Sequence, residues 1–295
     1  MKISIIIPYS QRGTQIKLCL EGLQKQKMPF GDFEVIIVGD ANDTLLNQGE
    51  MIIKHIPFDV SSYERFPFAM MRNEGAEKAE GSVLVFLDCD IILSSDFLSN
   101  TWLEHREEKK LSFALRKKLP EDSCINSITE VRRYRCDRDE REEVCSFFGG
   151  NYEKIETLWL WVYSHTMCIN KDEFFESGKF CENLKGWGLE DSEFAYRIMK
   201  KGVPIVCDTK SRCYHVWHPE NFDKSRAEGY KKNLDIIRSI YKDPVLDGLD
   251  LCAGCLEPKS MLKLVSYGMS PQALSLFLYE SYVRGYQHNI AELED

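Results

Sequence analysis

The sequence predicts an α/β protein with a mostly parallel central sheet flanked by helices. Two nearly continuous apolar runs, residues 3–7 and 33–39, are rich in Ile and Val. Such runs are typical of parallel strands that are covered on both faces. Between them apolar residues recur at helical spacing, which predicts a crossover helix over residues 14–28 that ends at Pro29. The chain therefore begins with a βαβ unit.

The third predicted strand, residues 82–87, follows a helix expected over residues 66–79 and leads directly into Asp88 and Asp90. An ordinary interpretation is that Asp is common where a chain leaves a strand and turns. The alternative is a divalent cation site, because carboxylate oxygens suit Mg²⁺ or Mn²⁺. The short D-x-D pattern alone does not decide between them.

Polar residues follow all three of these strands. In open α/β sheets, ligands bind outside the carboxyl ends of the strands. Residues 8–12, Asp40 and residues 88–90 are therefore expected along one edge of the sheet.

Composition limits the classes of partner. The formal net charge of -9 argues against a general nucleic-acid binder, which normally carries a basic surface.

The start of the chain does not resemble a leader, and no apolar run approaches the length of a membrane span, so a cytoplasmic protein without an integral membrane segment is expected. The eleven cysteines form no evident disulfide framework, and the single Cys252-x-x-Cys255 spacing is interpreted as structural or incidental thiols rather than a zinc or redox site.

Residues 116–157 are dense in charge, which favours a solvated surface segment. The alternative is a mobile lid whose basic residues meet a phosphate or an acceptor. Order returns with the apolar stretch 158–169 and a helix near Lys171. Helical patterns dominate from residue 222, so a main domain over residues 1–221 and a helical C-terminal extension over residues 222–295 are expected.

A glycine-flanked aromatic precedes an acidic pair later in the chain. Gly186 and Gly188 allow a tight turn that presents Trp187, and Glu190 and Asp191 begin the following helix. Acidic residues in a first helical turn are common because they complement the helix dipole. The functional alternative is that a carboxylate beside an aromatic platform takes the proton of a sugar hydroxyl.

Two histidines follow a strand predicted over residues 203–207. His215 and His218 lie three residues apart in the sequence. Such a pair is commonly structural, and it becomes a metal-binding candidate only where it meets other ligands such as the aspartates. Spacing alone does not show whether they meet.

Taken in order, these segments resemble the family 2 and related glycosyltransferases of the GT-A fold. The motifs are IPYSQR, VGDAND, FAMMRNEGAEKAEGSVLVFLDCD, SGKFCENLKGWGLEDSEFAYRI and YHVWH. The similarity is greatest to galactosyl- and N-acetylgalactosaminyltransferases that carry a W-G-x-E-D type acceptor motif. The resemblance covers about residues 1–220. It implies that the D-x-D pattern of Asp88 and Asp90 is a metal-binding motif.

The resemblance implies a site for a nucleotide-sugar donor, in which Arg72 of an Arg-Asn pair lies against the nucleotide and Asp40 contacts the uracil or ribose. Gly39 stands where many relatives have a first aspartate. The residues implied for the donor site are Pro8, Tyr9, Arg12, Asp40, Arg72, Asp88, Trp187 and Gly188.

The resemblance also implies a metal site and a catalytic pair. Asp90 and His218 match direct metal ligands, with His215 and Asp88 as further candidates. Glu190 and Asp191 match the acidic pair, and Asp191 is the expected base.

The implied reaction moves a sugar from a UDP-sugar to an acceptor hydroxyl in a single displacement with inversion. A mixed carboxylate and imidazole site fits Mn²⁺ better than Mg²⁺. A glycan, a lipid-linked saccharide, a peptide and a small metabolite all stay open as acceptors. Acceptor binding, homo-oligomer formation and docking on a membrane-bound partner stay open as roles of the extension.

The sequence bears on three other interpretations. A processive polysaccharide synthase is disfavoured because the chain shows neither a membrane span nor a Q-x-x-R-W motif. A nucleotidyltransferase would have a Gly-rich basic loop after its first strand, which PYSQRG matches poorly. A non-catalytic nucleotide-sugar-binding or interaction module on the same fold is disfavoured by the intact acidic and histidine motifs.

Overall fold

The computed structural model describes residues 1–121, 123–219, 224–247 and 279. Within them one eight-stranded sheet has the order β3-β2-β1-β4-β7-β6-β8-β5. The strands are β1 (Ile3–Tyr9), β2 (Phe33–Gly39), β3 (Ile53–Pro57), β4 (Val83–Leu87), β5 (Ile91–Leu93), β6 (Leu111–Lys118), β7 (Thr166–Asn170) and β8 (Ile205–His215). The α-helices are α1 (Gly13–Gln24), α2 (Asp43–Leu46), α3 (Phe68–Lys78), α4 (Phe97–His105), α5 (Glu140–Phe147), α6 (Lys171–Glu176), α7 (Glu190–Lys200), α8 (Lys224–Tyr241) and α9 (Pro244–Asp247). The 3-10 helices are η1 (Phe30–Asp32), η2 (Val60–Ser62), η3 (Ile128–Arg133), η4 (Tyr152–Lys154) and η5 (Leu158–Trp161).

The first half of the sheet is parallel, as its apolar runs predict. β1 pairs in parallel with β2 and β4, and β2 pairs in parallel with β3. In the register of β1 and β2, Tyr9 lies opposite Gly39. The carboxyl ends of these strands therefore meet at one edge, where the donor residues were expected.

The predicted crossover helix is present but ends earlier than expected. α1 ends at Gln24 rather than at residue 28. The Gln26 side chain donates hydrogen bonds to the carbonyls of Gly22 and Ser94, at 3.1 and 2.8 Å. These contacts hold the chain against the segment before α4, so it leaves the helix well before Pro29.

The second half of the sheet is mixed. β7 runs antiparallel to β4 and β6, and β5 runs antiparallel to β8, whereas β6 and β8 are parallel. β8 extends to His215, beyond the strand predicted over residues 203–207, because β6 pairs with it on one side and β5 on the other. The sheet is thus an α/β sheet with a parallel half and a mixed half.

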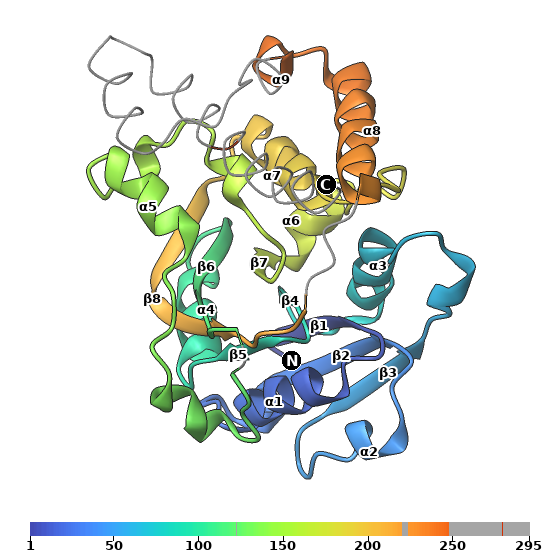
Figure 1. Cartoon of the computed structure of the whole chain (residues 1–295), viewed down its shortest axis with the longest axis vertical. Helices are drawn as coiled ribbons and strands as arrows, with labels where there is room; N and C mark the ends of the chain where they lie inside the picture. The colour runs from blue at the N-terminus through green and yellow to red at the C-terminus, as the bar shows by residue number, and fades with distance from the viewer. Residues whose placement is uncertain (122, 220–223, 248–278, 280–295) are drawn as a thin grey trace, which may run out of the picture.

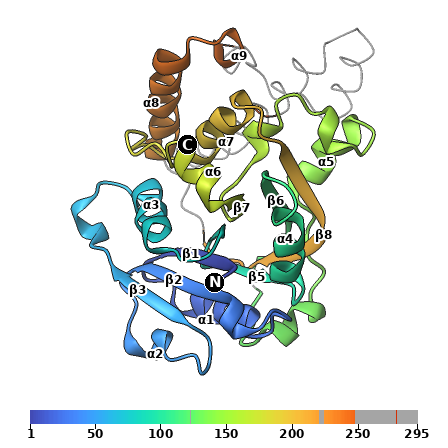
Figure 2. The same cartoon turned by 180° about the vertical axis from the view of Figure 1, so that it is seen from behind.

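Helices cover both faces of the sheet (Figures 1 and 2). Alternate β1 side chains enter different cores, since Ile6 packs in one buried cluster and Ile5 in the other. The Ile6 cluster also takes side chains of α3, α6, α7 and α8, and the Ile5 cluster takes those of α1, α2 and α4. The two-residue period of the strand thus assigns each face its own set of helices.

The prediction of a solvated charged segment over residues 116–157 is wrong at its centre. The Arg141 side chain is only 1% exposed and pairs with Asp139 at 2.5 Å. Arg141 also donates to the carbonyls of Ala114 and Trp161, at 3.2 Å each. Because its donors reach β6 and η5, Arg141 is part of the interior and not of a solvated surface.

The helical prediction for the C-terminal region is confirmed where the chain is described. Leu234 and Ile237 of α8 pack in the cluster that contains Ile6. Most of residues 222–295, including Cys252 and Cys255, lie outside the described residues. Among the helices that are described, none combines the length and the apolar character needed to cross a membrane.

Candidate active site

Asp90 lies close to both predicted histidines. Its Oδ2 atom is 3.1 Å from Nε2 of His218 and 3.7 Å from Nε2 of His215. One potential ligand atom from each residue lies within 4.8 Å of the others. Asp90, His215 and His218, the Asp90 cluster, therefore form a group that could hold a metal ion.

Pairing between β5 and β8 brings the cluster together. Ile91, directly after Asp90, lies opposite His215 in the antiparallel ladder. The N–H of Val216 donates to the backbone carbonyl of Asp90 at 2.8 Å. The aspartate and the first histidine are thus fixed by backbone hydrogen bonds, and His218 follows three residues later.

The electrostatics favour an ionised carboxylate in the cluster. Burial alone would raise the pKa of Asp90, but hydrogen bonds with His215 and His218 and the charge of Arg12 hold it well below its usual range. The hydrogen bond to Asp90 raises the pKa of His218. Mn²⁺ accepts carboxylate oxygen together with imidazole nitrogen, and three protein ligands leave positions for other oxygens.

Arg12 provides a positive charge at the same place. Its Nη1 atom hydrogen-bonds to Asp90 Oδ2 and lies 2.8 Å from His218 Nε2. The Arg12 side chain is 41% exposed, whereas that of Asp90 is 7% exposed. The guanidinium therefore covers the cluster from its solvent side.

Asp88 points to a different partner from Asp90. Its Oδ1 atom lies 3.2 Å from Nη2 of Arg72, and the other terminal nitrogen of Arg72 lies 3.2 Å from Oε1 of Glu190. The Arg72 side chain is 3% exposed, and its guanidinium lies 4.8 Å from the Phe68 ring centroid. Arg72 thus joins the D-x-D motif to the start of α7.

The neighbouring Asn73 has a structural role in this structure. Its side chain accepts a hydrogen bond from the N–H of Phe180 and donates to the carbonyl of the same residue, both at 3.0 Å. It also donates to Glu182 at 2.8 Å. Asn73 therefore fastens α3 to the segment that leads to the glycine-flanked tryptophan.

Asp191 has an unusual environment for a carboxylate. Burial raises its pKa to about 7, and the negative charge of Glu190 adds to this effect. The N–H groups of Ser164 and Ser192 donate to its two oxygens, at 3.1 and 2.8 Å. A carboxyl group with a pKa near 7 can accept a proton at neutral pH.

Residues 186–188, the GWG loop, rest on α8. Asn233 of α8 accepts a hydrogen bond from the N–H of Gly186 at 2.9 Å and donates to the carbonyl of Gly188 at 2.7 Å. Trp187 between them is 36% exposed. Ser164 and Asn233 were not predicted, because neither belongs to a motif and both act through contacts distant in the sequence.

Residues 8–12 and Asp40, expected along one edge of the sheet, lie at the ends of β1 and β2. Pro8 and Tyr9 are buried strand residues, and Ser10 donates to the exposed Asp40 at 3.4 Å. Gly39 has φ +141°, and a Cβ atom there would lie 1.8 Å from the carbonyl oxygen of Tyr9. The absence of an aspartate at this position is therefore a steric requirement of this strand pair.

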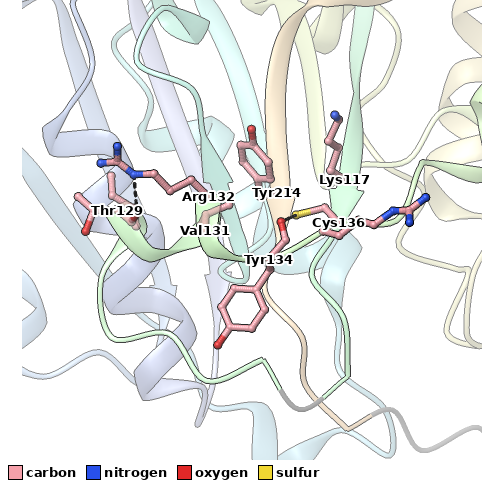
Figure 3. Close-up of a pocket in the computed structure, with 9 residues that line it drawn as sticks. Lys117, Thr129, Val131, Arg132, Tyr134, Cys136 and Tyr214 are labelled. Carbon is pink, nitrogen blue, oxygen red and sulfur yellow. Dashed lines mark hydrogen bonds between the residues drawn. The ribbon is translucent and has the colours of Figure 1, made fainter.

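A pocket of about 530 Å³ lies elsewhere, against Tyr214 and η3 (Figure 3). Its basic residues include Lys117 and Arg132, and Figure 3 shows their side chains pointing apart. None of the site residues predicted from the sequence lines it. It is thus separate from the candidate active site.

Comparison with known proteins identifies the family. Residues 4–227 match the family described as "Glycosyltransferase like family 2", so the chain belongs to that family. It is 22% identical over 268 residues to validoxylamine A glucosyltransferase of Streptomyces hygroscopicus subsp. jinggangensis, an alignment that covers 83% of this chain and 61% of that protein. The chain thus spans about three fifths of the length of this curated relative.

Two solved structures that contain nucleotide or nucleotide-sugar ligands share the fold. The S. aureus TarS 1-349 complex with UDP-GlcNAc has a TM-score of 0.54 at 15% identity, covering 98% of this chain and 93% of that one. The GalNAc-T7 complex with UDP, GalNAc and Mn²⁺ has a TM-score of 0.56 at 17% identity, covering 91% and 54%. These neighbours confirm the predicted GT-A fold, and the family match over residues 4–227 agrees with it.

Proposed function

We propose that the protein is a metal-dependent glycosyltransferase that moves a sugar from a UDP-sugar to an acceptor hydroxyl with inversion. The observation that carries this proposal is the Asp90 cluster at the carboxyl edge of the sheet. The presence of UDP-GlcNAc in one structural neighbour, and of UDP with Mn²⁺ in another, supports the choice of donor and ion.

Asp90, His215 and His218 would hold the ion, and Asp88 is a further candidate ligand through its place in the D-x-D motif. A divalent ion supplies positive charge that stabilises a departing diphosphate. Arg12, which contacts Asp90 and is partly exposed, would contact the phosphates. The other donor residues, Pro8, Tyr9, Asp40 and Arg72, are assigned to the nucleotide.

Asp191 is the proposed base. The acceptor oxygen bonds to the anomeric carbon while the bond from that carbon to the phosphate oxygen breaks, and the acceptor proton passes to Asp191. Attack opposite the leaving phosphate inverts the anomeric configuration. Glu190 is the weaker candidate, because its carboxylate is paired with Arg72, whereas Asp191 accepts only N–H and hydroxyl hydrogen bonds among the contacts described.

The W-G-x-E-D motif is assigned here to residues 187–191. Trp187 and Gly188 would form the platform for the sugar rings, directly before the acidic pair. We assign residues 1–221 to the catalytic domain and residues 222–295 to the extension.

Calorimetric titration of UDP and a panel of UDP-sugars, first with Mn²⁺ and then with EDTA, tests the donor site. Binding that requires the metal is the expected result. Absence of binding by every UDP compound in Mn²⁺ would refute the proposed donor and favour a non-catalytic module or another nucleotide.

Two single variants test the base once a donor is known. Asp191→Asn is expected to bind the UDP-sugar normally and to release UDP at least about a hundredfold more slowly, within the range that general bases contribute. Glu190→Gln is the matched control that removes the other charge of the pair. If Glu190→Gln is the more damaging substitution for turnover with binding intact, the assignment of the base is wrong.

A further inference from the structure

The Gly186 and Gly229 backbones approach very closely between the GWG loop and α8. A Cβ atom added to Gly186 would lie 2.1 Å from the Gly229 carbonyl oxygen, and one added to Gly229 would lie 2.5 Å from the Trp187 nitrogen. Any side chain at either position would separate loop and helix. The two glycines therefore make this contact possible.

Asn233 adds polar contacts one helical turn further along α8. Its side chain is fully buried, and both ends of the amide bond to the loop, one to the Gly186 N–H and one to the Gly188 carbonyl. A buried amide in this position satisfies two backbone groups that would otherwise lack partners. Tyr230 completes the contact, since its ring lies 3.7 Å from the place of a Gly188 Cβ.

The loop conformation needs such support. Gly188 has φ +76°, and Leu189 has φ +70°. For a leucine this left-handed conformation is strained, because the Cβ atom comes too close to the following carbonyl oxygen. Leu189 is nevertheless 4% exposed and directly precedes Glu190 and Asp191, so a change in the loop would be passed on to the acidic pair.

We propose that α8, a helix of the extension, is a positioning element of the acceptor site, and that Asn233 is the positioning residue that holds the GWG loop in place. This inference rests on the proposed function, because it assigns the loop to sugar binding. It gives α8 a role in catalysis although none of the residues proposed to bind the ion or to transfer the proton belongs to this helix.

Hydrogen exchange measured by mass spectrometry tests the contact itself without any substrate. Asn233→Ala should speed exchange of the amides in residues 185–189 by about tenfold, because one net hydrogen bond is lost from the Gly186 amide. Gly229→Ala, which inserts a methyl group at the contact, should have the same local effect. Asp235→Ala, on the exposed face of the same helix, is the matched control and should leave exchange unchanged.

Binding and turnover of the UDP-sugar that the wild-type protein prefers test whether the contact between Asn233 and the GWG loop supports catalysis. Asn233→Ala should bind UDP and Mn²⁺ within about twofold of wild type and should release UDP from the UDP-sugar at least about tenfold more slowly. A general loss of folding would weaken UDP binding as well.

The outcomes separate this inference from the proposed function. If exchange in residues 185–189 is unchanged in both variants, the contact does not hold the loop. If exchange is faster but turnover is normal, the contact has no role in catalysis. If the wild-type protein neither binds nor turns over any UDP-sugar, the proposed function fails and the catalytic role of Asn233 fails with it.

Discussion

The Nε2 atom of His218 lies 3.1 Å from the carboxylate of Asp90, so a histidine that follows β8 contacts an aspartate that follows β4. The short strand β5 makes this contact possible, because it begins directly after Asp90 and pairs with the end of β8. A candidate metal site therefore depends on an antiparallel pairing of three residues.

Asp90→Asn should abolish binding of Mn²⁺. It removes the negative charge from a cluster whose other two ligands are imidazoles, and the loss of affinity should exceed the roughly hundredfold seen when a partner of a metal ligand is removed. Calorimetry with Mn²⁺ in the presence and absence of UDP measures this. Asp88→Asn is the control, and a smaller effect is expected because Asp88 pairs with Arg72. Equal losses in the two variants would make Asp88 a direct ligand.

Arg12→Ala should change metal and nucleotide affinity in opposite directions. Arg12 contacts Asp90 and His218, so its positive charge should repel an ion bound there. Because Arg12 is partly exposed, solvent screens much of this repulsion, and its removal should strengthen binding of Mn²⁺ alone by only about tenfold. Binding of UDP with Mn²⁺ should weaken, because the proposed contact of Arg12 with the phosphates is lost. Lys17→Ala removes a charge from the exposed face of α1 and should change neither affinity. Weaker binding of Mn²⁺ alone in Arg12→Ala would contradict this role.

Turnover should depend on pH through Asp191. Burial raises its pKa to about 7, and a base works only when it is unprotonated, so kcat should fall about tenfold per pH unit below that value and level off above it. Rates of UDP release between about pH 5.5 and 8.5 test this in the wild-type protein. UDP binding is measured over the same range as a control. A profile of kcat that is flat down to pH 5.5 would exclude Asp191 as the base.

The buried Arg141 should be essential for stability. Arg141→Met leaves Asp139 without its buried partner, and such losses cost about 3–5 kcal/mol in the free energy of unfolding. Arg133→Ala is the matched control in the same charged segment, because the Arg133 side chain is 71% exposed and exposed ion pairs contribute about 0–1 kcal/mol. Urea unfolding gives both values. Similar small losses would show that the Arg141 pair is not buried in solution.

Gly39→Asp, which introduces the residue that the family resemblance leads us to expect here, should destabilise this chain. The new Cβ atom would meet the Tyr9 carbonyl oxygen, so a loss of more than about 2 kcal/mol is expected. Gly49→Ala is the control, because Gly49 also has positive φ but nothing lies within 4 Å of its Cβ position. Thermal unfolding midpoints compare them, and equal shifts would show that the Tyr9 contact carries no extra cost.

The sequence predicts β1, β2, β4 and their shared edge because their apolar runs are long and their ends carry polar residues. It does not predict that His215 meets Asp90, since that contact depends on the pairing of β5 with β8. The burial of Arg141 is equally hidden, because exposed and buried arginines look alike in a charged segment. Ser164 and Asn233 act through tertiary contacts and belong to no motif.

The hydrogen bond from the Val216 N–H to the Asp90 carbonyl divides the candidate metal site into a fixed and an adaptable part. Asp90 and His215 are joined through the sheet, so the distance between their backbones does not adjust to the ion. His218 lies beyond the end of β8 and outside the ladder. We therefore expect ions of different radius to be accommodated by movement of His218, which makes the short segment after β8 the part of the chain that determines ion preference.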